Sequence, residues 1–118
     1  MDTTFEENEL LLRAVLPTDM YWVNGKLSSA AFKDRRGLSV DRTGDRSLSD
    51  AVKYIKSNFK NRRIVSVTVP LCRSIDAYLK YLPTSNKYHS EIHGSKTNVV
   101  LSNRQARQLA NNAKIEQE

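Results

Sequence analysis

Residues 47–69 read SLSDAVKYIKSNFKNRRIVSVTV, and this stretch joins the clearest helix pattern of the chain to its clearest strand pattern. Ser47 can accept a hydrogen bond from the backbone amide of Asp50, whose carboxylate can reach back, as in a capping box. Apolar residues then recur at helical spacing, at Leu48, Ala51, Val52, Ile55 and Phe59. β-Branched side chains dominate from Ile64 to Val69, which predicts a strand. A helix over about 47–60 and the strand that follows it are therefore the starting point for the fold.

Shorter patterns surround this stretch. Asn24-Gly25 after Tyr21-Trp22-Val23 favours a type I′ hairpin, and Ser102 with Gln105 forms a second capping box, which opens a helix over about 102–114. Strand patterns cover residues 10–16, 38–40, 77–82 and 88–93, of which the first also suits a short helix. This irregular order predicts an α+β fold with a mixed or antiparallel sheet and two main helices. We expect a single domain over 1–118, with flexible ends at 1–8 and 115–118.

Composition restricts the cellular location. No apolar run approaches the roughly 20 residues of a membrane helix, and the acidic start of the chain differs from the basic start of a secretory signal. The single cysteine, Cys72, cannot close an internal disulfide, and its apolar neighbours favour a buried, inert thiol. We therefore expect a cytoplasmic protein with no membrane contact.

Positive charge is concentrated in one segment of the chain. Eleven Lys and Arg residues but only four Asp residues lie between Lys26 and Arg63, whereas the whole chain carries a formal charge of +6. Such a segment attracts phosphate groups. Lys53, Lys56 and Lys60 lie along one flank of the predicted helix and form a cationic ridge, for which a merely solvated face is the alternative.

Hydroxyl and guanidinium groups are dense within residues 28–42. Serine hydroxyls and the free amides at a helix start can donate to an anion, and arginines can bind it with paired hydrogen bonds. Equally, the serines can be helix caps, and the aspartates can neutralise neighbouring arginines on a solvated loop. The candidate ligand-binding residues here are Ser28, Ser29, Arg35, Arg36, Ser39, Asp41 and Arg42, in addition to the three lysines of the helix.

The sequence HSEIH at 89–93 is the second candidate site. Strand alternation places His89, Glu91 and His93 on one face, about 7 Å apart, which we expect to be too far for direct hydrogen bonds. Zinc usually needs more ligands than this group supplies, so we expect neither a metal site nor a cofactor. His89 is instead a candidate general acid or base for cleaving an RNA phosphodiester or transferring a group to it, with a structural histidine as the alternative.

The segments SSAAF (28–32), GLSVDR (37–42) and HSEIHG (89–94) are similar to segments shared by small uncharacterised bacterial proteins. The resemblance extends over most of residues 10–114. No activity, cofactor or partner follows from this resemblance. The resemblance does imply that the serine pair, Asp41-Arg42 and His89 belong to one surface.

These observations lead to three hypotheses about function. The leading one is a domain that binds a phosphate-bearing partner, RNA or a nucleotide, through residues 26–63. The second is an enzyme in which His89 acts as acid or base while Arg42 and Ser29 hold the substrate phosphate. The third is a protein-interaction module of a toxin or defence system, whose basic face meets an acidic protein.

Overall fold

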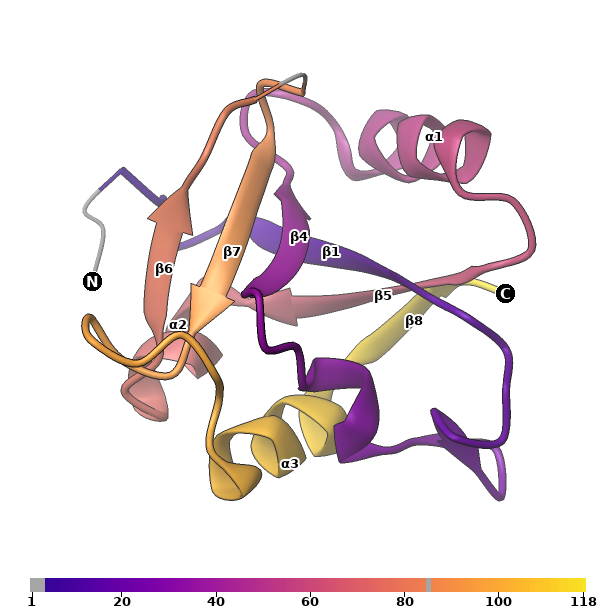
Figure 1. Ribbon diagram of the computed structural model, residues 1–118. Helices are drawn as coiled ribbons and strands as arrows, with labels where there is room; N and C mark the ends of the chain where they lie inside the picture. The colour runs from indigo at the N-terminus through magenta and orange to yellow at the C-terminus, as the bar shows by residue number, and fades with distance from the viewer. Residues whose placement is uncertain (1–3, 85) are drawn as a thin grey trace.

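The computed structural model describes residues 4–84 and 86–118, and within them six strands form one antiparallel sheet (Figure 1). The strands lie in the order β6 (Tyr78–Tyr81), β7 (His89–His93), β4 (Leu38–Arg42), β1 (Leu10–Val15), β5 (Arg63–Thr68) and β8 (Lys114–Gln117). A separate hairpin joins β2 (Trp22–Val23) to β3 (Lys26–Leu27). Asn24 and Gly25 in its turn have φ values of 53° and 77°, as a type I′ turn requires.

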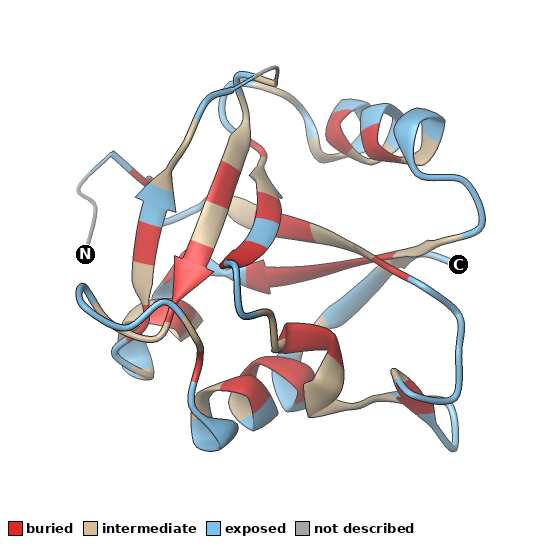
Figure 2. Cartoon of the chain, in the orientation of Figure 1, coloured by how far each residue is buried: buried red, intermediate tan, exposed pale blue. Residues whose placement is uncertain are grey.

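The sheet curves around a core on its inner face. Burial alternates along β4 and β7, which places Leu38, Val40 and Ile92 inside and leaves Ser39 outside (Figure 2). The inner face of β1 and β5 adds Leu11, Val15, Val65 and Val67 to the same core. Because residues with period two share a face, one side of each strand supplies the core and the other is left for surface contacts.

A helix covers part of the outer face of the sheet. Helix α1 (Leu48–Asn58) buries Ala51 and Ile55 against Leu12 and Ile64, which project outward from β1 and β5. Ser47 accepts a hydrogen bond from the backbone amide of Asp50 at 3.1 Å and caps the helix as the sequence predicts. This helix forms one wall of the site described below.

The remaining helices close the inner core. Helix α3 (Asn103–Asn112) buries Ala106, Leu109 and Ala110, carries the predicted capping box of Ser102 and Gln105, and lies against the short 3-10 helix η1 (Ser29–Phe32) (Figure 1). Helix α2 (Val69–Ser74) buries Val69 and Cys72. The α+β architecture, its antiparallel sheet and its two longer helices therefore confirm the predicted fold class.

Three details differ from the sequence-based expectations. The strand predicted over 64–69 ends at Thr68, whose hydroxyl accepts from the amide of Leu71 and starts α2. Residues 115–117, within the end expected to be flexible, belong to β8, which pairs with β5, and Glu116 accepts a hydrogen bond from Ser66. Phe5 is buried in the core within the segment expected to be flexible at 1–8, of which residues 1–3 lie outside the described part.

Within residues 4–84 and 86–118, no helix has the length and apolar character that crossing a membrane requires.

Candidate functional site

The sheet opens between β1 and β4. Only Leu11 with Arg42 and Leu12 with Asp41 pair across these strands among the described residues, whereas β1 pairs with β5 along its whole length. The side chain of Arg13 crosses the opening, where its Nε donates to the carbonyl of Ala31 at 2.7 Å and its Nη1 to that of Ser39 at 2.8 Å. Arg13 thus holds β4 and η1 in place beside β1.

A cavity of about 270 Å³ lies beside this opening, between the C-terminal part of α1 and the outer face of β4 and β7. We call it the groove site. It combines side chains from four segments that are far apart in sequence, around residues 12–14, 34–41, 55–62 and 89. Its lining comprises Leu12, Arg13, Ala14, Asp34, Ser39, Val40, Asp41, Ile55, Phe59, Arg62 and His89.

Two guanidinium groups line the groove site together. Burial is the main cause of a lowered pKa for Arg13; the charge of Asp34 opposes this shift, and the like charge of Arg62 adds to it. Across residues 4–84 and 86–118, neither Arg13 nor Arg62 forms an ion pair with a carboxylate. Two neighbouring cations without a direct anionic partner make this wall of the cavity suited to an anion.

Ser39 and His89 meet across the neighbouring strands β4 and β7. Their side chains share the outer face of the sheet, and His89 Nε2 lies 3.3 Å from Ser39 Oγ. His89 Nδ1 lies 3.0 Å from the carbonyl oxygen of Leu82. Because a carbonyl oxygen can only accept, Nδ1 carries a proton, and in the neutral ring Nε2 is the acceptor for the Ser39 hydroxyl.

The carboxylate of Asp41 is held on the same face. Both of its oxygens accept from the amide of Asn86 at 3.0 Å, and the guanidinium of Arg46 lies 4.0 Å away. These contacts fix Asp41 as a polar wall beside His89, its directly paired residue on β7.

Arg42 is not part of the groove site. It points to the inner side of the sheet, where it pairs with the buried carboxylate of Glu9 at 2.5 Å and stacks 4.2 Å from the ring of Phe5. The guanidinium of Arg42 is thus paired with a carboxylate 33 residues earlier and lies outside the cavity that Ser39, Asp41 and His89 line.

The serine pair also lies outside the lining of the groove site. Ser28 Oγ donates to the carbonyl of Met20 at 2.8 Å and forms no side-chain cap on η1, which Ser29 begins. Of the residues that the resemblance groups on one surface, Asp41 and His89 line the groove site, whereas Ser28, Ser29 and Arg42 are not among its lining residues.

The remaining basic candidates fall into separate places. Lys53 and Lys60 are exposed on and after α1, and Arg35 and Arg36 are exposed on the loop before β4. Lys56 instead donates to the carbonyls of Arg62 at 3.0 Å and Glu118 at 3.2 Å, which joins α1 to the end of the chain. Lys56 has a structural role here, and the predicted ridge is reduced to its two exposed lysines.

The expectation that no direct hydrogen bond forms within HSEIH is wrong for one pair. His93 Nε2 lies 2.7 Å from Glu91 Oε1, because both side chains turn toward each other along the same face of β7. Gly37 lies beneath this carboxylate, and a Cβ added there would come within 2.3 Å of Glu91 Oε1. In the part of the chain that the structure describes, no group of three His, Cys, Asp or Glu side chains is arranged to hold a metal ion.

Sequence reasoning missed Arg13, Arg62 and Phe59. Arg13 had a local signal, since it is the single charge within the apolar run LLLRAVL. Phe59 follows α1 and remains 47% exposed beside the cavity, where the guanidinium of Arg62 lies 5.6 Å from its ring. The helical spacing places Phe59 on the apolar face of the predicted helix, and nothing in the local pattern of Arg62 distinguishes it from an ordinary surface residue.

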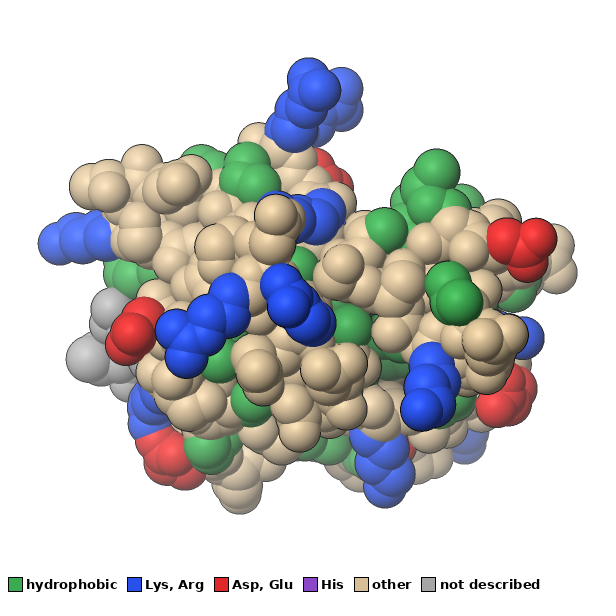
Figure 3. All heavy atoms as spheres, turned by 90° about the horizontal axis from the view of Figure 1, so that it is seen from below, with side chains coloured by type: hydrophobic (Ala, Val, Ile, Leu, Met, Phe, Trp, Pro, Cys, Tyr) green, Lys and Arg blue, Asp and Glu red, His purple; other side chains and the backbone are tan. Residues whose placement is uncertain are grey.

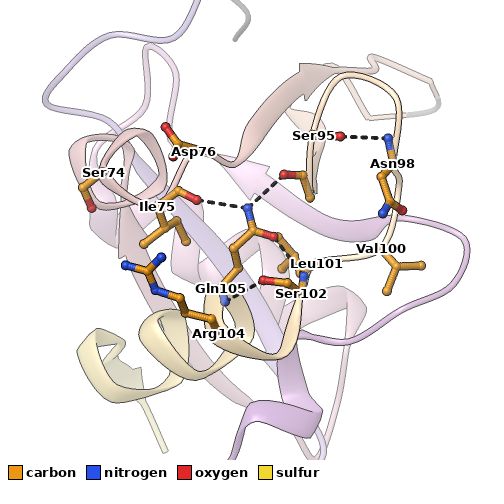
Figure 4. A pocket seen from close by; sticks show the side chains of 11 residues that line it. Ser74, Ile75, Asp76, Ser95, Asn98, Val100, Leu101, Ser102, Arg104 and Gln105 are labelled. Carbon is orange, nitrogen blue, oxygen red and sulfur yellow. Dashed lines mark hydrogen bonds between the residues drawn. The ribbon is translucent and has the colours of Figure 1, made fainter.

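A larger cavity of about 490 Å³ lies at the N-terminal end of α3 (Figure 4). Gln105 points into it and donates to the carbonyls of Ile75 and Gly94, while its Oε1 accepts from the amide of Ser102. The side chain thereby joins α2, β7 and α3. Because the polar groups of Gln105 are used for these structural hydrogen bonds, the cavity is a weaker candidate than the groove site.

Basic side chains do not form one continuous patch on the face that carries α3 and η1. Figure 3 shows Lys and Arg scattered over this face, with apolar and uncharged groups between them. The groove site is distinguished by the grouping of its side chains in one cavity. No known protein family, curated protein or solved structure matches the chain.

Proposed function

We propose that the groove site binds one nucleotide unit, either as a free nucleotide or within an RNA strand, with the phosphate at Arg13 and Arg62. The observation that carries this proposal is the grouping of two guanidinium groups, without ion-pair partners in the described residues, in one cavity with Ser39 and His89. A phosphate there removes the repulsion between the two cations and accepts several charge-assisted hydrogen bonds.

Phe59 supplies the surface for a base. Its ring is half exposed, borders the same cavity and lies next to the guanidinium of Arg62. Bases stack on exposed aromatic rings and on guanidinium planes with little preference for sequence. Phosphate at the arginines and a base on Phe59 together favour a nucleotide over inorganic phosphate.

The size of the cavity agrees with a single unit. Its volume of about 270 Å³ is slightly below the roughly 300–1,000 Å³ of typical small-molecule pockets. A longer RNA would therefore place one nucleotide in the groove site and its remaining phosphates along the surface. Lys53, Lys60, Arg35 and Arg36 are exposed and attract such phosphates through screened charge.

The cytoplasm is the compartment we propose, since RNA and nucleotides occur there and the buried thiol of Cys72 needs no oxidising environment.

Fluorescence anisotropy with a short labelled RNA, and calorimetry with mononucleotides, test this function at low salt. We expect Arg62→Gln to weaken binding about tenfold or more, since one charge-assisted contact contributes roughly 1.5–3 kcal/mol. Arg107→Gln, on the exposed side of α3, is the matched control and should bind like the wild type. Equal losses in the two variants would indicate non-specific charge attraction and contradict a nucleotide site in the groove.

Binding to neither probe, combined with co-purification of an acidic protein, would support the protein-interaction hypothesis instead.

A further inference from the structure

Ser39 has the surroundings of an activated hydroxyl. It is exposed at the groove site, and its Oγ lies 3.3 Å from His89 Nε2. The other ring nitrogen is fixed by the carbonyl of Leu82 at 3.0 Å, which directs the lone pair of Nε2 at the serine. A nucleophile next to a base that a third group orients is the arrangement used in covalent catalysis.

Ser39 and His89 lie on two strands that pair with each other. Asp41 is paired with His89 and Ser39 with Glu91, so Ser39 and His89 are diagonal neighbours on adjacent strands, β4 and β7 (Figure 1). Arg13 donates to the backbone carbonyl of Ser39 and holds this part of β4, which has lost its pairing with β1. Supports of this kind keep a reacting hydroxyl in a constant position.

We propose that Ser39 is a nucleophile and His89 its general base in the hydrolysis or transfer of a phosphodiester. The class of substrate rests on the proposed nucleotide binding, whereas the reactivity of Ser39 does not.

In the first step Ser39 Oγ attacks phosphorus, and its proton passes to His89 Nε2. The bond between phosphorus and the leaving oxygen breaks, and that oxygen takes the proton from Nε2. Water then attacks the phosphoseryl group, again losing a proton to Nε2, and Ser39 Oγ recovers that proton as its bond to phosphorus breaks. Arg13 and Arg62 offset the negative charge on the phosphoryl oxygens.

A fluorophosphonate probe tests the nucleophile directly, because its reaction forms the Oγ–phosphorus bond and releases fluoride. Mass spectrometry after digestion should place the added mass on Ser39 of the wild-type protein. Ser39→Ala should lose this label, whereas Ser49→Ala, an exposed serine of α1, should keep the wild-type rate.

His89→Asn tests the base, because asparagine can still donate to the Leu82 carbonyl but cannot accept a proton as imidazole does. We expect the labelling rate to fall at least about 100-fold, the lower end of the effect of a general base. Thermal unfolding of this variant, compared with that of the wild type, tests whether the fold persists.

Equal labelling rates in His89→Asn and wild type, or no label on Ser39 in folded wild-type protein, would overturn the inference. RNA binding that survives in the unlabelled protein would leave the proposed function standing. Labelling that depends on His89, without any nucleotide binding, would support the nucleophile and overturn the phosphodiester as its substrate.

Discussion

Glu9 is a carboxylate surrounded by hydrogen-bond donors. It accepts from Arg42 at 2.8 and 2.5 Å, from the amide of Gly44 at 2.9 Å and from the amide of Glu6 at 2.8 Å. Burial raises its pKa, but the hydrogen bonds from Arg42 and the two amides outweigh burial, so that the pKa is lowered from its usual value of 4.5. A group with a lowered pKa stabilises the fold above its unfolded pKa and loses this contribution as the pH falls.

Replacing Glu9 by Gln should therefore destabilise the protein at neutral pH. We expect a loss of about 3 kcal/mol in the free energy of unfolding, because the guanidinium of Arg42 is left buried without its anion. Urea unfolding at neutral pH and below about pH 4.5 measures the effect, and the difference between wild type and Glu9→Gln should shrink in acid. A constant difference across this range would contradict the assigned role of Glu9.

Cys72 gives a second prediction at the scale of one residue. Burial raises the pKa of its thiol to about 12, so the reactive thiolate is scarce at neutral pH. An aromatic disulfide reagent should leave the native protein unmodified and react with one thiol per chain in denaturant. Rapid modification of the native protein would mean that α2 opens readily from the core.

At the scale of elements, the sequence predicted what local chemistry decides. The caps at Ser47 and Ser102, the apolar stripes that follow and the Asn-Gly turn all act within a few residues. Helix α2 escaped prediction because its first residue, Val69, continues the β-branched pattern of β5, and the cap by Thr68 separates the two elements. Strand β8 escaped because its stability comes from pairing with β5 rather than from its own composition.

Gly37 at the entry to β4 tests how this element supports the site. Its φ is +108°, and a Cβ there would collide with the carboxylate of Glu91. Gly37→Ala should lower the free energy of unfolding by about 1–3 kcal/mol through backbone strain. Displacement of the Glu91 carboxylate should add a further loss.

Gly25→Ala is the matched control, because Gly25 also has a positive φ of 77° but has no atom within 4 Å of an added Cβ. Denaturant unfolding gives the loss of stability of both variants. The difference between the two losses is the contribution of the collision with Glu91, because backbone strain is common to both. Equal losses would show that the contact between Gly37 and Glu91 contributes nothing to stability.

At the scale of the whole molecule, the sequence and the resemblance placed Asp41 and His89 on one surface, but they did not add Arg13 and Arg62 to it. Ser39 and Asp41 are candidates from the stretch 28–42 and His89 is a candidate from HSEIH, and the pairing of β4 with β7 brings the three to one face. Arg42 was assigned to the same group because it is their neighbour in sequence, yet alternation along β4 turns it to the opposite side. Arg13 and Arg62 enter the site through contacts between distant segments, which local patterns do not record.

If the proposed function holds, base stacking on Phe59 and general charge attraction should contribute to RNA binding in different ways. Phe59→Ala should weaken RNA binding by roughly 1–3 kcal/mol, the contribution of one stacked base, without changing how affinity depends on salt. Lys60→Gln should instead weaken binding modestly and reduce the slope of log affinity against log salt by about 1, because one fewer phosphate is neutralised.

Both side chains are exposed and lie outside the core, so these substitutions should preserve the fold. Anisotropy titrations over a series of salt concentrations measure affinity and slope together. If Phe59→Ala reduced the slope as Lys60→Gln does, or left affinity unchanged, no base would stack at the groove site, and binding would reduce to general attraction between a basic surface and a polyanion.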